Sequence, residues 1–68
     1  MKATGKKIDV GGVKVPEYAL DPGEPAEQAA EKLGLYLDGP WHTENVGAVL
    51  VDTDGSQYKA RKKVEKKT

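Results

Sequence analysis

Residues 46–51 read Val-Gly-Ala-Val-Leu-Val and form the most apolar run in the chain. The run is short, rich in β-branched side chains and bounded by turn residues, which is typical of a buried central strand. Residues 52–55 (DTDG) predict a tight turn, in which Gly55 supplies the positive φ. Residues 56–64 (SQYKARKKV) then return as a second strand, so this half of the chain predicts a β-hairpin.

A second hairpin is predicted at residues 6–16 (KKIDVGGVKVP). Apolar and polar side chains alternate on both sides of Gly11-Gly12, and two glycines suit a type I′ or II′ turn. This register sets Asp9 opposite Lys14 on one face. On the other face it pairs Val10 with Val13 and Ile8 with Val15. One longer strand with a glycine bulge is the alternative, and Pro16 is expected to end the strand in either case.

The segment 21–34 (DPGEPAEQAAEKLG) predicts a short helix between the two hairpins. Its apolar side chains follow the i, i+3, i+4, i+7 spacing of one helical face, at Ala26, Ala29, Ala30 and Leu33. Pro25 fits the first helical position, and Gly34 fits the position just after the C-terminal end. A helix of about ten residues does not persist alone in water. Its alanine-rich face must therefore lie close against a sheet.

These segments together predict an α+β fold, in which a β-hairpin, a short α-helix and a β-hairpin share a single small sheet with one packed helix. A small, bent, barrel-like sheet with a helix is the alternative. Apart from Met1, only 17 apolar side chains are larger than alanine. This number is enough for one small core, so residues 1–68 are expected to form one domain. The ends, residues 1–5 and 65–68, are expected to be flexible.

The charges are balanced in total and segregated along the chain. The 11 basic and 11 acidic side chains give a formal net charge of zero. Residues 1–15 carry a balance of +3, residues 16–55 of −8 and residues 56–68 of +5. Such blocks indicate interaction surfaces or tails, or basic ends that fold back on an acidic middle. The neutral total argues against a dedicated binder of polyanions.

The basic C-terminal block contains a candidate binding face. Lys59, Arg61 and Lys63 recur at every second residue, so a strand projects them from one face at roughly 6.6–6.8 Å intervals. With Lys66 and Lys67 of the tail, they would suit contacts to nucleic-acid phosphates. Lysines on a solvent-facing edge strand that prevent aggregation are the simpler interpretation.

Trp41 follows the apolar triplet 35–37 and the predicted turn 38–40. As the largest apolar side chain of the sequence, it is expected to anchor the core. If it is exposed instead, it is a candidate aromatic anchor for a partner, because tryptophan is enriched at binding hot spots. His42, beside it, is close enough in sequence to pair with Asp38 or Glu44.

Catalysis is not expected. The chain has no cysteine and one histidine, which excludes thiolate and multi-histidine metal sites, and no serine or threonine lies in a recognisable nucleophile setting. No cofactor or small-molecule substrate is predicted. No contact with a membrane is predicted either, since no apolar run approaches the length of a membrane span.

The leading hypothesis is therefore a non-catalytic protein-binding module, an accessory, inhibitor or assembly component that binds a protein partner or itself. A cytoplasmic location is expected. The small size also fits a phage-encoded protein, which could instead be located within a virus particle. A nucleic-acid-binding accessory protein that uses the basic face and tail is the alternative.

Overall fold

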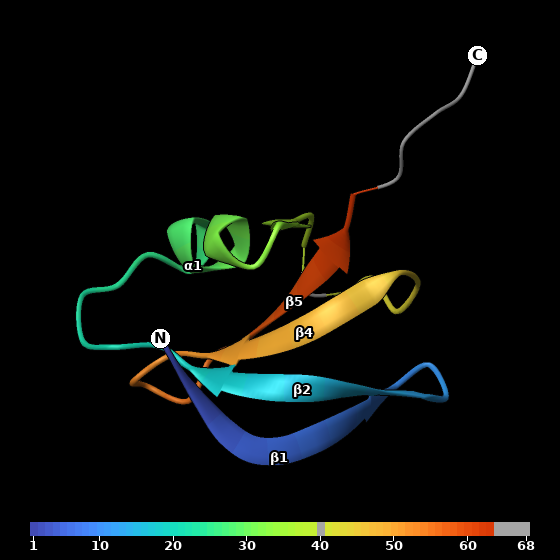
Figure 1. Ribbon diagram of the computed structural model, residues 1–68, viewed down its shortest axis with the longest axis horizontal. Helices are drawn as coiled ribbons and strands as arrows, with labels where there is room; N and C mark the ends of the chain where they lie inside the picture. The colour runs from blue at the N-terminus through green and yellow to red at the C-terminus, as the bar shows by residue number, and fades with distance from the viewer. Residues whose placement is uncertain (40, 64–68) are drawn as a thin grey trace.

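The computed structural model describes residues 1–39 and 41–63. Five strands and one helix follow each other along this part of the chain (Figure 1): β1 (Lys2–Val10), β2 (Val13–Ala19), α1 (Ala26–Lys32), β3 (Leu35–Leu37), β4 (Val46–Val51) and β5 (Gln57–Lys62). The predicted α+β fold, with both hairpins in one sheet and a helix packed on it, is confirmed.

The strands form an open mixed sheet in the order β1-β2-β4-β5-β3. The two hairpins join through parallel pairing of β2 with β4, while the other neighbours are antiparallel. Parallel neighbours need a crossover, and here the chain between β2 and β4 passes through α1 and β3. Because the sheet is open, the chain does not adopt the barrel-like alternative.

The first hairpin has the predicted register. Val10 lies opposite Val13, and Asp9 lies opposite Lys14. Gly11 and Gly12 have φ values of 59° and 85°, and two positive φ angles are what a type I′ turn requires. Glycine accepts these angles without strain, so the local sequence is sufficient to define this turn.

The prediction that the strand ends at Pro16 is wrong, because β2 continues through it to Ala19. Proline removes one ladder donor, so it is tolerated only where that donor is not needed. The pairing of β2 with β4 begins at Glu17, after the proline. On the other side, β1 has a register irregularity between Ala3 and Lys7, and Lys7 is the partner of Pro16.

The helix α1 is shorter than expected; it begins one residue after the predicted start and has the predicted C-terminal end and buried face. Pro25 is its N-cap residue, and Gly34 after it has a φ of 73°. Ala29 and Ala30 are fully buried, which lets the helix lie close on one face of the sheet (Figure 1). The apolar triplet after the helix forms β3, a strand that the sequence analysis did not predict. It pairs with β5 at the edge of the sheet.

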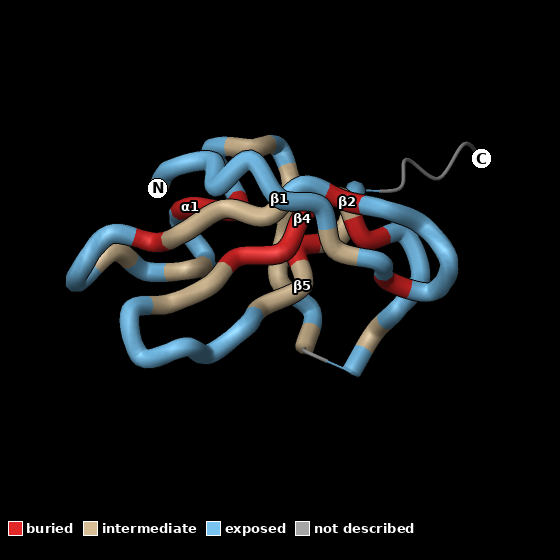
Figure 2. The backbone as a smooth tube through the Cα atoms, turned by 90° about the horizontal axis from the view of Figure 1, so that it is seen from below, coloured by how far each residue is buried: buried red, intermediate tan, exposed pale blue. Residues whose placement is uncertain are grey.

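Most residues of β4 are buried (Figure 2), and their apolar side chains contribute to clusters on both faces of the sheet. On the helix side, a cluster comprises Leu20, Ala29, Ala30, Leu50 and Ala60. On the opposite side, a second cluster comprises Val10, Val15, Val46 and Val49. A register shift between Val46 and Ala48 brings Val46 into the second cluster with Val49.

The N-terminus is attached to the segment that precedes the helix. The Met1 ammonium lies 2.9 Å from an Asp21 carboxylate oxygen and 2.6 Å from one of Glu24. The backbone of residues 2–5 belongs to β1, and the flexibility expected of residues 1–5 stays a prediction. Residues 65–68, the other end expected to be flexible, lie outside the described residues.

We expect Leu50→Ala to lower the free energy of unfolding by about 3 kcal/mol, since a fully buried leucine leaves a cavity in a small core. Urea denaturation followed by far-ultraviolet circular dichroism measures the change. Val13→Ala is the matched control, because Val13 is 60% exposed and its truncation leaves no cavity. Equal losses in the two variants would contradict the central position of β4.

The ion pair at the N-terminus predicts a stability that depends on pH. The hydrogen bond to Glu24 raises the pKa of the Met1 ammonium, and the same bond lowers the pKa of Glu24. A raised amine pKa gives stabilisation that is complete below about pH 8 and is lost as the pH rises through the raised value. A lowered carboxyl pKa gives stabilisation that is present above about pH 4.3 and is lost as the pH falls through the lowered value.

We therefore expect Glu24→Gln to lower the melting temperature at neutral pH and to have a smaller effect in alkali and in acid. Melting curves across this range measure the difference from the unmodified chain. Glu31→Gln, an exposed helical residue, is the control and should leave the pH profile unchanged. A Glu24→Gln effect of the same size at every pH would show that the pair does not act through charge.

Candidate functional site

The loop between β3 and β4, residues 38–45, crosses the end of β5. This path follows from the strand order, because β5 lies between β3 and β4 in the sheet. Ala60 belongs to the cluster under the helix, so its neighbour Arg61 projects from the opposite face, where it contacts Asp38 and Glu44 of the loop. The backbone of the loop is tied to β5 at its end, where the Lys62 amide donates to the Asn45 carbonyl at 2.7 Å.

Arg61 is the side chain around which the loop is arranged. Its Nε donates to the Glu44 carbonyl oxygen at 3.2 Å, and one terminal nitrogen donates to the Asp38 carboxylate. The other terminal nitrogen lies 3.7 Å from a carboxylate oxygen of Glu44. The guanidinium also lies over the Tyr36 ring, with Cζ 5.9 Å from the centroid. Only 12% of the Arg61 side chain is exposed. Because Asp38 and Glu44 lie near the two ends of the loop, this one arginine contacts the loop at both ends.

His42 lies between the same two carboxylates. Nε2 is 3.5 Å from Asp38 and Nδ1 is 3.5 Å from Glu44, so both partners suggested by the sequence are close. These three side chains are not arranged as ligands of one metal ion, and the described residues contain no other group that is. The arrangement is that of an ion-pair network that holds a loop.

Trp41 lies on the outside of this loop. The expectation that it anchors the core is wrong, because 74% of the residue is exposed. The loop lies on the surface of the sheet, while the buried side chains of the core come mainly from the strands and the helix. Trp41 is therefore left outside the core. The indole packs on Gly39 and its ring is 5.5 Å from that of His42. A Cβ at residue 39 would lie 2.5 Å from the indole, so glycine is needed there.

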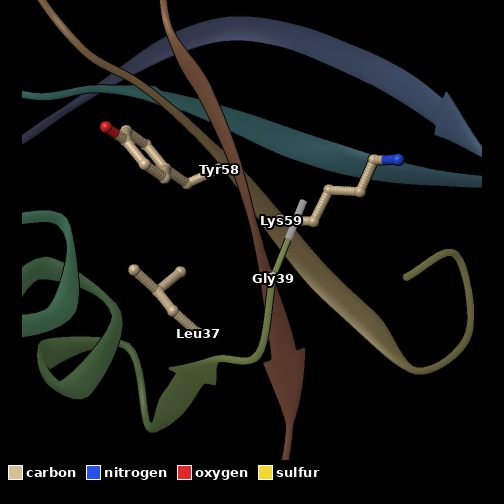
Figure 3. Close-up of a pocket in the computed structure, with 4 residues that line it drawn as sticks. All are labelled: Leu37, Gly39, Tyr58 and Lys59. Atoms are coloured by element: carbon tan, nitrogen blue, oxygen red, sulfur yellow. The ribbon is translucent and has the colours of Figure 1, made fainter. Parts of the chain in front are cut away.

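The candidate basic face is not uniform in the structure. Lys59 is half-buried and extends to the side of the sheet opposite Tyr58 (Figure 3), as strand alternation predicts. Arg61 is engaged by Asp38 and Glu44, as described above. Lys63 is exposed directly after β5. The two tail residues of the prediction, Lys66 and Lys67, lie outside the described residues.

The hollows on the described surface are small. The cavity shown in Figure 3, lined by Leu37, Gly39, Tyr58 and Lys59, measures about 30 Å³. A groove beside the hairpin turn measures about 200 Å³, and a hollow beside the helix about 260 Å³. Sites for small-molecule substrates typically have volumes of roughly 300–1,000 Å³. All three hollows are smaller than this range.

Comparison with protein-family models, curated proteins and solved structures finds no match to this chain. In the described part of the chain, no helix has the length and apolar character that crossing a membrane requires. The interpretation of the site therefore rests on its geometry.

The sequence analysis missed the role of Arg61, which it assigned to a row of surface cations. The sequence signal for this role is the pair of carboxylates at Asp38 and Glu44, near the start and the end of the loop. Their link to Arg61 depends on the strand order, which no local pattern specifies.

We expect Arg61→Gln to release the loop without unfolding the sheet. Losing the charged hydrogen bonds should lower the free energy of unfolding by about 1–2 kcal/mol, because the carboxylates remain solvated. Heteronuclear NOE values of residues 41–45 and the near-ultraviolet circular dichroism of Trp41 should both fall. Lys63→Gln, which removes an exposed cation, is the control and should change neither signal. An ordered loop in Arg61→Gln would contradict the assigned role.

Proposed function

We propose that this chain is a non-catalytic protein-binding module, an accessory, inhibitor or assembly component that uses Trp41 as its contact residue. The observation that carries the proposal is a tryptophan that is 74% exposed on a loop held by an ion-pair network. Tryptophan is among the residues most enriched at binding hot spots, so an exposed tryptophan on a loop with several fixed contacts is a candidate contact residue.

The network around Arg61 supports this proposal through the entropy of binding. A partner that contacts a mobile loop must order it, which reduces the affinity. Here the loop is already fixed at Asp38 and Glu44, and the Trp41 ring rests on Gly39 and His42. The aromatic ring is thus presented in one place before a partner arrives.

Protein is favoured over nucleic acid as the partner because of the charges next to Trp41. Asp38 and Glu44 flank the arginine of the candidate basic face, and their exposed fractions are 48% and 69%. These carboxylates would repel phosphates at the position where the alternative needs attraction. A phage origin, and action in the cytoplasm or in a virus particle, remain expectations drawn from the small size alone.

We expect Trp41→Ala to abolish the capture of a specific partner by the immobilised chain, with circular dichroism unchanged. Gln28→Ala is the matched control, since Gln28 is exposed on α1 at the opposite face of the sheet. Trp41 is the single tryptophan of the chain, so its fluorescence should shift to the blue when the captured partner is added.

Equal capture by the two variants would contradict the role of Trp41. Binding of single-stranded DNA that falls steeply with salt, in place of a protein partner, would favour the nucleic-acid alternative.

A further inference from the structure

The strand β1 forms one edge of the sheet, and none of the described residues pairs with its outer side. It is the outermost strand in Figure 1 and pairs with β2 alone. The other edge strand, β3, has three residues, whereas β1 runs from Lys2 to Val10. A long free edge carries a row of unpaired N–H and C=O groups, which is a template for a further strand. This part of the fold therefore offers backbone pairing to another chain.

The glycine turn of the first hairpin decides which backbone groups of β1 point outward. In a two-residue turn the carbonyl before the turn accepts from the amide after it, so Val10 directs its backbone groups to β2. Successive residues alternate, so Ile8 faces β2 as well, while Lys7 and Asp9 face away from it. Pro16 agrees with this assignment, because it lies opposite Lys7 and has no N–H to donate. The free edge thus presents the backbone groups of Lys7 and Asp9.

The side chains at this edge alternate between charged and apolar. Lys7 and Asp9 are exposed on one face of the sheet. Ile8 is half-buried on the other face, where it packs against the second cluster of the core. Neither Lys7 nor Asp9 forms an ion pair with another described residue. One carboxylate oxygen of Asp9 accepts from the Gly12 amide at 3.0 Å, which holds this side chain at the edge. A cation and an anion are therefore left two residues apart on the same edge.

A second copy of β1 matches these charges in one register. A two-fold axis perpendicular to the sheet sets the two edge strands antiparallel, and outward groups of one strand must lie opposite outward groups of the other. With the axis at Lys7 or at Asp9, that residue faces its own copy, and like charges directly opposite each other destabilise a sheet. With the axis at Ile8, each Lys7 faces the Asp9 of the other copy, and both pairs attract.

The two ends of this segment exclude the neighbouring positions of the axis. At Val10 the axis would set Asp9 against the glycine turn of the other copy, where the φ angles are positive. At Lys6 it would set two lysines opposite each other and bring Lys7 against Gly5, which has a φ of 79° and lies in the register irregularity. Lysines and irregularities commonly protect edge strands from pairing. Here they block the other registers and leave the one centred on Ile8.

We propose that two copies of this chain pair through β1 in the antiparallel register centred on Ile8, which joins their sheets into one. Lys7 and Asp9 of opposite copies then exchange both of their backbone hydrogen bonds, and their side chains form an ion pair on each side of the axis. The two Ile8 side chains meet at the axis and connect the second clusters of the two cores. The pairing does not involve Trp41, so it goes beyond the proposed function. Small interfaces are weak, so this dimer dissociates on dilution.

A dilution series of the full chain, followed by sedimentation equilibrium and by hydrogen exchange of the amides, tests the pairing. We expect the mean mass to rise from that of the monomer toward that of the dimer between micromolar and millimolar concentration. The amides of Lys7 and Asp9 should gain protection over the same range, whereas those of Ile8 and Val10 should be protected throughout, because they face β2. A chain that stays monomeric at millimolar concentration, or a dimer that leaves the Lys7 and Asp9 amides unprotected, would overturn the inference.

Charge reversal tests the register. Lys7→Glu sets acidic side chains opposite each other, so it should weaken the dimer at least about tenfold, as two ion pairs become repulsive. Asp9→Lys sets lysines opposite each other and should weaken it likewise. A mixture of these two variants restores opposite charges at both pairs, so it should form the dimer that neither variant forms alone.

Lys2→Glu is the matched control, since it makes the same charge reversal on β1 outside the paired segment and should leave the dimer unchanged. Circular dichroism checks that each variant is folded. A dimer that is indifferent to Lys7→Glu, or a mixture that stays monomeric, would contradict the register. Loss of the dimer in Trp41→Ala would place the contact at the loop and would also overturn the inference.

Discussion

The structure depends on the burial of β4 from both sides. Leu50 points into the cluster under the helix, and Val49 points into the valine cluster on the other face. Leu50 and Val49 are the largest fully buried side chains of the described residues, so both clusters depend on the central position of this strand. Its neighbours follow from that position: β5 by a tight turn, and β2 by the crossover that carries α1. The alanine face of the helix matters because it allows the approach that buries Leu50.

The crossing loop is a consequence of the same arrangement. Once β3 pairs on the far side of β5, the chain has to pass over β5 to reach β4. A loop that lies on a sheet brings polar backbone groups and carboxylates with it. Arg61 donates hydrogen bonds to the Glu44 carbonyl and the Asp38 carboxylate, and its third nitrogen lies near the Glu44 carboxylate. Arginine suits this place better than lysine, because its planar fork contacts Asp38 and Glu44 at once. The result is a surface with a fixed shape in a very small protein.

The two exposed apolar side chains of the described surface both border this loop. Trp41 stands on its outer side, and Val13 faces it across the groove. Paired charges hold the loop at Asp38 and Glu44, so Trp41 stands on a segment that is fixed at both ends.

Local sequence signals account for the elements whose causes are local. The register around Gly11-Gly12, the turn at Gly55 and the helix end at Gly34 all follow from glycine conformations and from alternation, and the structure has each of them. The parallel pairing of β2 with β4, the edge strand β3 and the exposure of Trp41 became visible only in the folded chain. These features depend on contacts between segments far apart in the chain. Size and apolarity made Trp41 a core candidate, but the core was already filled by strands and helix, and the position of the loop left it outside.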